Sequence, residues 1–97
     1  MDRPLFARYP ALKSGIPHLA LAELPTPVQR MERLERAVGA DAPALFIKRD
    51  DLSNPVYGGN KVRKLEFVLV RARQRGYPAV LTFGAAGSNH ALATAIF

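Results

Sequence analysis

The sequence predicts an α/β protein with an open parallel sheet and helices on both faces. Residues 44–48 and 79–83 are short apolar segments with the length of buried strands. Segments with helical periodicity surround them, and a glycine-rich turn at residues 84–89 precedes the last helix. Strands that alternate with helices pair in parallel through crossovers. Because two strands cannot form such a sheet, we expect these 97 residues to be an incomplete N-terminal part.

The first third of the chain divides into an arm and a predicted helix. Residues 1–24 carry several prolines and little periodicity, so we interpret them as an extended N-terminal arm. We expect residues 25–97 to be the N-terminal part of the α/β domain. Thr26, with Gln29 three residues later and a proline between them, matches a capping box. This pattern predicts a helix that starts there and ends at Gly39.

A second helix is predicted over residues 61–75, with Asn60 as its N-cap and Gly76 as its end. The apolar residues of this segment fall on one helical stripe and most of its arginines lie outside it. The stripe consists of Val62, Leu65, Val68, Leu69 and Ala72. The strand at 79–83 follows, and a third helix is expected from His90 onward.

Composition excludes several classes of site. There are no cysteines, which excludes disulfides and thiolate metal sites, and two histidines do not support a metal site. No apolar stretch approaches the roughly 20 residues that cross a bilayer, and no signal peptide is evident, so we expect a cytoplasmic protein. The net charge of +6 is spread over amphipathic segments and mostly indicates solvated helix faces. Arg30, Arg33 and Arg36 keep a basic nucleic-acid-binding module as a hypothesis of another class.

The sequence Gly-Gly-Asn-Lys at residues 58–61 is the first candidate for chemistry. Paired glycines permit positive φ and close approach of a planar ligand. Lys61 would lie at the positive end of a helix dipole, near Arg63 and Lys64, and both effects disfavour its ammonium form. A neutral amine is what Schiff-base chemistry requires. By itself, however, the tetrapeptide favours a glycine turn followed by a solvent-facing lysine.

The turn at residues 84–89 is the second candidate, because backbone N–H groups at a helix start form an anion site. Ser88 and Asn89 add donors for a carboxylate, a phosphate or a phenolate. The glycine spacing matches neither a P-loop nor a dinucleotide fingerprint. A tight turn in which Ser88 or Asn89 caps the helix is an equal alternative.

Four other residues are of types that can act as ligands or catalytic groups. His18 is expected to be packed or exposed rather than a ligand. Asp50 and Asp51 are better explained by loop capping and by salt bridges to their basic neighbours than as paired catalytic carboxylates. Tyr57 either lines a pocket or lies in a surface loop.

Taken together, four segments resemble the D-cysteine desulfhydrase/1-aminocyclopropane-1-carboxylate deaminase family. They are Leu-Pro-Thr-Pro at 24–27, Lys-Arg-Asp-Asp-Leu at 48–52, Gly-Gly-Asn-Lys-Val-Arg-Lys-Leu-Glu at 58–66 and Ser-Asn-His at 88–90. The resemblance implies the fold-type II architecture of pyridoxal-phosphate (PLP) enzymes, like the tryptophan synthase β-subunit. It places the phosphate loop and the pyridine-nitrogen partner beyond residue 97.

The resemblance also implies roles for individual residues. Lys61 would form the internal aldimine with PLP and shuttle protons, with Asn60 and Asn89 as further cofactor-binding residues. Asn89 would hydrogen-bond the phenolic oxygen. Ser88, with the backbone N–H groups of Asn89 and His90, would receive the substrate carboxylate, and Ser88 is also a candidate nucleophile or proton-transfer group. Gly87 stands where the family usually has glutamine, which leaves the substrate open.

The function implied is that of a PLP-dependent lyase or deaminase acting on a small amino acid. D-cysteine desulfhydrase-like β-elimination to pyruvate, sulfide and ammonia comes first, and 1-aminocyclopropane-1-carboxylate deamination is the alternative. An inactive family remnant remains a third hypothesis. We expect no nucleic-acid or membrane partner, a homodimer for the full-length protein, and little activity from these residues alone.

Overall fold

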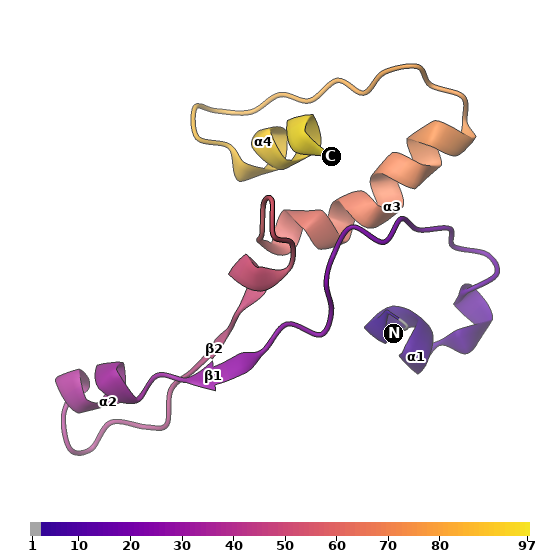
Figure 1. The fold of residues 1–97 in the computed structure, drawn as a ribbon. Coiled ribbons are helices and arrows are strands. Elements are labelled where there is room, and N and C mark those ends of the chain that lie inside the picture. Colours follow the sequence, from indigo (N-terminus) through magenta and orange to yellow (C-terminus); the bar gives the residue numbers. More distant parts are fainter. Residues whose placement is uncertain (1–2) are drawn as a thin grey trace.

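A computed structural model describes residues 3–97 of the chain (Figure 1). It is elongated, with principal extents of 57 × 38 × 19 Å. Its elements, in chain order, are α1 (Pro4–Arg8), η1 (Pro10–Leu12), β1 (Val28–Arg30), α2 (Glu32–Val38), β2 (Phe46–Lys48), η2 (Asp50–Leu52), α3 (Asn60–Gln74) and α4 (Asn89–Ile96). The long helix α3 packs against α4, and the pair of strands projects from one end of the molecule with α2 at its tip.

The sheet differs from the prediction. Within residues 3–97 it has two strands, and β1 and β2 are antiparallel, with Val28 opposite Lys48 and Arg30 opposite Phe46. The strand expected at 44–48 is therefore present, but it is not buried, since Phe46 is 61% exposed. The parallel pairing expected from alternating elements is wrong for this part of the chain. The reason is that β2 pairs with residues 28–30, which the sequence pattern assigned to a helix, and not with the expected strand at 79–83.

The second expected strand, at 79–83, does not form within residues 3–97. The segment is extended without ladder partners, and Leu81 and Phe83 are 91% and 89% exposed. A strand needs a neighbour that satisfies its backbone N–H and C=O groups. No other segment within residues 3–97 pairs with 79–83, and the side chains of Leu81 and Phe83 stay exposed.

The capping box at Thr26 was a wrong prediction. The Thr26 hydroxyl donates to Asp50 Oδ1 at 3.0 Å instead of capping a helix, and the residues after it pair as β1. Helix α2 begins at Glu32, with Met31 as an N-cap that makes no side-chain cap bond. Tertiary contacts thus override a strong local signal. The predicted end is confirmed, because Gly39 closes α2 with φ of 132°.

Helix α3 is confirmed with two adjustments. Gly59, with φ of 112°, is its N-cap, and Asn60 is its first residue rather than the cap. Val62 and Leu65 are buried as predicted, whereas Val68 is 44% exposed. The buried face instead includes Val70 and Glu66. Gly76 follows the helix end with φ of 72°.

The N-terminal arm is not extended throughout, contrary to the prediction. Helix α1 and η1 fold back so that Phe6, 2% exposed, packs beside α3. Its ring centroid lies 4.9 Å from that of His18 and 6.3 Å from that of Phe67. His18 is therefore packed between aromatic rings, as expected. The reason for the fold-back is that α3 offers an apolar and ionic surface that a single turn of helix can cover.

Candidate functional site

The loop before Lys61 is tied down by one buried hydroxyl. Ser53, at the end of η2, is fully buried; its Oγ donates to the carbonyl of Gly59 at 2.9 Å and accepts from the N–H of Gly59 at 3.0 Å. The same N–H also donates to the carbonyl of Asp50 at 2.7 Å. Both backbone polar groups of Gly59, the N-cap of α3, are thus satisfied by Asp50 of η2 and by Ser53, its C-cap.

Asn54 organises the rest of this loop. Its side-chain oxygen accepts from the N–H groups of Val56 and Tyr57 at 2.8 and 3.2 Å, which is an Asx turn. Its side-chain nitrogen donates to the carbonyl of Leu21 at 2.8 Å and ties the loop to the arm. The excursion between η2 and α3 is therefore held at both ends.

The two glycines predicted to matter are required for different reasons. A Cβ at Gly58 would lie 1.8 Å from the carbonyl oxygen of Asp51, so no side chain fits there. Gly59 has open space around it but a φ of 112°, which side chains rarely tolerate. Both requirements arise from the return of the loop onto η2.

Lys61 is the second residue of α3 and is half-buried. Its amine makes no hydrogen bond or ion pair with any residue of the described range 3–97. Asn60, immediately before it, is exposed. The structure thus presents Lys61 on an ordered helix start with its amine unengaged.

The second motif is a tight turn in which Ser88 is the N-cap of α4. Its Oγ accepts from the N–H of Ala91 at 3.2 Å, so the capping alternative is realised. Gly87 has φ of 80°, and a Cβ at Gly84 would come within 2.6 Å of the Ser88 side chain. The first N–H groups of a helix have no acceptor within it. Since Ser88 serves Ala91, the N–H groups of Asn89 and His90 remain open to a ligand.

One hydrogen bond joins the two motifs. The phenol of Tyr57 donates to Asn89 Oδ1 at 2.9 Å across 32 positions of sequence. In Figure 1, α4 lies beside the beginning of α3, as this bond and the helix packing require. Tyr57 is therefore part of the site rather than an isolated loop residue. Because Oδ1 is occupied, the Asn89 amide nitrogen is left to donate elsewhere.

His90 contributes an unsatisfied atom. Its Nδ1 is buried and has no hydrogen-bond partner in the part of the chain that the structure describes. Its backbone carbonyl accepts from Thr94 Oγ1 at 2.7 Å. A buried polar atom without a partner is uncommon and marks a place where a further group belongs.

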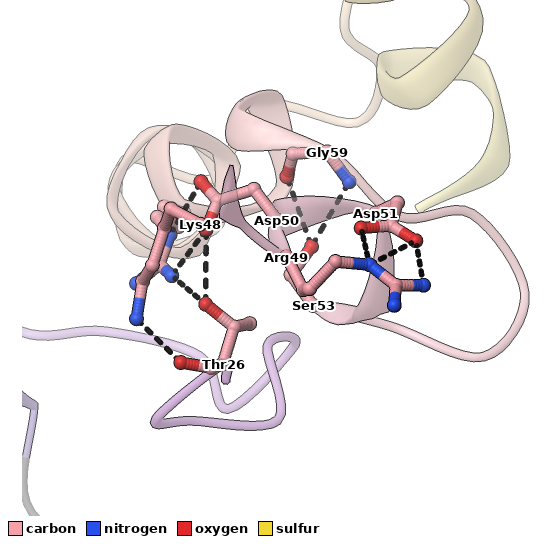
Figure 2. A network of polar contacts seen from close by, with 8 residues as sticks. Thr26, Lys48, Arg49, Asp50, Asp51, Ser53 and Gly59 are labelled. Carbon is pink, nitrogen blue, oxygen red and sulfur yellow. Dashed lines mark hydrogen bonds and ion pairs between the residues drawn. The ribbon is translucent and has the colours of Figure 1, made fainter. Parts of the chain in front are cut away.

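Asp50 is the centre of a polar network (Figure 2). Its carboxylate accepts from Arg63 Nη2 at 2.7 Å and Nε at 3.2 Å, and from the Thr26 hydroxyl. The hydrogen bond from Arg63 is the main reason that the pKa of Asp50 lies below its ordinary value, and burial opposes this. Lys48 donates from Nζ to the carbonyl of Thr26 at the edge of the network.

Asp51 follows the sequence prediction and Asp50 does not. Asp51 pairs with Arg49 at 2.7 Å, and that guanidinium lowers the pKa of Asp51. Asp50 pairs with Arg63, 13 positions away, which the sequence did not reveal. Glu66, buried on α3, was also missed. Its signal was its spacing, because it lies four residues after Val62 and therefore on the predicted stripe.

The structure also bears on nucleic-acid binding, metal binding and membrane insertion. Of the three arginines proposed as a basic stripe, Arg30 pairs with Glu35 and Arg36 with Glu32. Across residues 3–97 no group of three or more histidine, cysteine or acidic side chains could hold a metal ion. No helix in that range is long and apolar enough to span a bilayer.

With this geometry described, comparison with known proteins defines the class. The family described as "Pyridoxal-phosphate dependent enzyme" matches residues 19–97, and the chain belongs to that family.

Its relatives include two named activities. The chain is 46% identical over 86 residues to "Putative 1-aminocyclopropane-1-carboxylate deaminase" of Pyrococcus abyssi, covering 89% of this chain and 25% of that protein. It is 42% identical over 79 residues to "D-cysteine desulfhydrase" of Salmonella paratyphi B, covering 81% of this chain and 23% of that protein. The chain thus spans about a quarter of the length of the relatives it matches.

A solved structure described as an ACC deaminase homologue superposes with a TM-score of 0.75 at 40% identity. The match covers 97% of this chain and 27% of that one. It supports the fold-type II class predicted from the sequence. The complete open sheet is not present in residues 3–97, and a parallel sheet stays a prediction for the whole protein.

The residues present fit the cofactor that this family uses. An unengaged lysine amine and free amide donors at the start of α4 are groups that can bind an anionic aldehyde. The orphaned Nδ1 of His90 adds a buried polar atom to the same helix start.

Proposed function

We propose that the full-length protein is a PLP-dependent lyase or deaminase that acts on a small amino acid, with Lys61 as the cofactor lysine. The observation that carries this is the hydrogen bond from Tyr57 to Asn89, which brings the lysine motif and the Ser-Asn-His motif to one place. The family of the chain and the names of the two relatives support the same proposal. Bound PLP would supply an electron sink for charge that develops at the α-carbon.

Each residue then has a role that its contacts allow. Lys61 would hold the cofactor through its unengaged amine and afterwards move a proton at the substrate. Asn89 would donate from its amide nitrogen to the phenolic oxygen, with Asn60 next to the lysine as a second cofactor contact. The Ser88 hydroxyl, whose oxygen accepts from Ala91, keeps its proton to donate to a substrate carboxylate.

The open N–H groups of Asn89 and His90 would bind the same carboxylate at the positive end of α4. Binding there orients the α-carbon toward the lysine and keeps the carboxylate away from the reacting bonds. Ser88 could alternatively transfer a proton or act as a nucleophile in a ring-opening reaction, since its hydroxyl is half-exposed.

We propose D-cysteine as the substrate, with pyruvate, sulfide and ammonia as products, and 1-aminocyclopropane-1-carboxylate as the alternative. For D-cysteine, Lys61 would remove the α-proton before sulfide leaves. The cyclopropane substrate has no α-proton, so a group must act on the ring instead, and the relative from Pyrococcus abyssi favours retaining this candidate. An assay of the full-length protein for sulfide from D-cysteine and for 2-oxobutanoate from the cyclopropane acid separates the two. Absence of both products would reject the pair.

The cofactor lysine has a direct test. Full-length protein reconstituted with PLP is reduced with borohydride, which makes the bond to the lysine permanent, and the labelled peptide is located by mass spectrometry. We expect the label on Lys61 and none in Lys61→Ala. A label that persists elsewhere in Lys61→Ala would remove the central assignment. We also propose that the full-length protein is a homodimer, which sedimentation velocity measures.

A further inference from the structure

The chain is held on both sides of Lys61 by the same residue. Two positions before the lysine, the N–H of Gly59 donates to the backbone carbonyl of Asp50 at 2.7 Å. Two positions after it, Arg63 donates to the carboxylate of Asp50 at 2.7 and 3.2 Å. The first turn of α3 is therefore clamped to η2 at both ends.

The clamp is braced by a third residue. Thr26 is 3% exposed, and its hydroxyl donates to Asp50 Oδ1 while accepting from Arg63 Nη2 at 3.0 Å. The Asp50 carboxylate thus accepts three hydrogen bonds, two of them from one planar guanidinium. A two-point contact of this kind fixes direction as well as distance.

We infer that Asp50 is a positioning residue for Lys61: its carbonyl and carboxylate together set the backbone from Gly59 to Arg63 and thereby aim the lysine. This inference rests on the proposed function, in which Lys61 holds the cofactor. Within residues 3–97, no hydrogen bond or ion pair joins Asp50 to Lys61 itself. A lysine that must bond to one carbon of a rigid cofactor depends on its backbone position, and displacements near 1 Å are costly in such sites.

A purely structural role for Asp50 is the competing explanation, and the chain offers a matched control. Asp51 is adjacent and pairs with Arg49, but its side chain is 57% exposed and does not contact α3. Asp50→Asn and Asp51→Asn therefore make the same chemical change one residue apart. The Asp50→Asn variant keeps the backbone carbonyl of residue 50 but loses the negative charge and one of the two oxygens that accept from Arg63.

The experiment uses full-length protein with PLP and measures three quantities. They are the PLP dissociation constant, the fraction of protein labelled on Lys61 after borohydride reduction, and the pH midpoint at which the visible band of bound cofactor changes. We expect Asp50→Asn to weaken PLP binding by about tenfold, since hydrogen bonds to charged groups have that size, and to shift the midpoint. Asp51→Asn should match the wild type in all three.

Thermal unfolding of the cofactor-free proteins controls for global damage. If Asp50→Asn does not fold, Thr26→Val decides, because it removes the bracing hydroxyl without removing a charge, and we expect a smaller change in the same direction. Arg63→Lys keeps the positive charge but loses the two-point contact with the Asp50 carboxylate. Its PLP affinity and band midpoint should lie between those of the wild type and Asp50→Asn.

Two failures can be told apart. A folded Asp50→Asn or Thr26→Val variant that equals Asp51→Asn in PLP affinity and band midpoint would overturn the positioning role while leaving Lys61 assigned. A wild-type label on another lysine would instead overturn the proposed function, and the positioning inference with it.

Discussion

Arg3 and Glu66 form a buried ion pair that joins the N-terminal arm to the helix that carries Lys61. Their side chains are 9% and 2% exposed, and the residues lie 63 positions apart. Glu66 Oε1 also accepts from the N–H groups of Leu21 and Ala22 at 3.0 and 2.8 Å, and Arg3 Nη1 donates to the carbonyl of Ala22 at 3.0 Å. The Glu66 carboxylate thus accepts hydrogen bonds from three residues of the arm, Arg3, Leu21 and Ala22.

Glu66→Gln should destabilise the full-length protein by about 3 kcal/mol, because it leaves the buried Arg3 charge without a counter-charge. Urea denaturation measures the loss. Glu32→Gln is the control, since its partner Arg36 lies 3.8 Å away on the surface with both side chains more than 60% exposed. Such a pair contributes at most about 0.5 kcal/mol. Equal effects of the two variants would show that the buried pair has no special role.

The pH dependence of stability should report on Asp50. Arg63 and the Thr26 hydroxyl hold the pKa of Asp50 below its ordinary value, and Lys48 acts in the same direction. A carboxyl group whose pKa is lower in the folded than in the unfolded state stabilises the fold fully at pH values above its unfolded pKa of about 3.9. This stabilisation is lost as the pH falls through the folded-state pKa. The difference in unfolding free energy between wild type and Asp50→Asn should therefore be constant near pH 6 and shrink below pH of about 4. A difference that grows on acidification would contradict the lowered pKa.

Gly58→Ala should destabilise the protein by more than about 1 kcal/mol and reduce PLP binding, because its Cβ would meet the Asp51 carbonyl at 1.8 Å and push the loop off η2. Denaturant unfolding and PLP titration measure the two effects. Gly15→Ala is the matched control, since the nearest atom to its Cβ lies 4.0 Å away. If Gly58→Ala has the stability and PLP affinity of the wild type, the loop accommodates the added Cβ and the prediction is wrong.

Tyr57→Phe should leave stability nearly unchanged and weaken PLP binding about three- to tenfold, the size of one neutral hydrogen bond. The phenol orients the Asn89 amide, so its loss lets that side chain turn. PLP titration followed by absorbance checks this. Tyr9→Phe, 55% exposed and beside Arg8, should bind PLP like the wild type. No difference between the two variants would remove Tyr57 from the site.

Residues 79–83 should be a protected strand in the full-length protein, although they are unpaired within residues 3–97. Leu81 and Phe83 are too exposed to stay so in a stable fold. Hydrogen exchange should show these amides slower than those of Ala40 and Asp41, which lie in an exposed turn. Exchange as fast as in that turn would contradict the predicted parallel sheet.

Local signals located several features correctly. The apolar period and flanking glycines placed α3 within one residue, and Ser88 was one of the two residues offered as a cap at the glycine turn. The extended motif around Lys61, together with Ser88-Asn89-His90 in register, predicted the family that the comparisons show. These succeed because the information lies within a few adjacent residues.

Other features failed where distant residues compete for the same groups. Thr26 carries a capping signal, yet its hydroxyl is taken by Asp50, 24 positions away, and the following residues pair with β2. Arg3 and Glu66 lie 63 positions apart in the sequence and are buried together. Which donor meets which acceptor is decided only when the chain folds back on itself.

The sequence by itself therefore determined the family and the lysine helix and offered Ser88 or Asn89 as the cap of α4, because these signals lie in short runs of residues. Only the tertiary structure decided that the strands are antiparallel, that Tyr57 meets Asn89, and that Asp50 clamps both sides of Lys61. Hydrogen bonds and ion pairs act over a few ångströms in space, and sequence separation does not reveal which residues come that close.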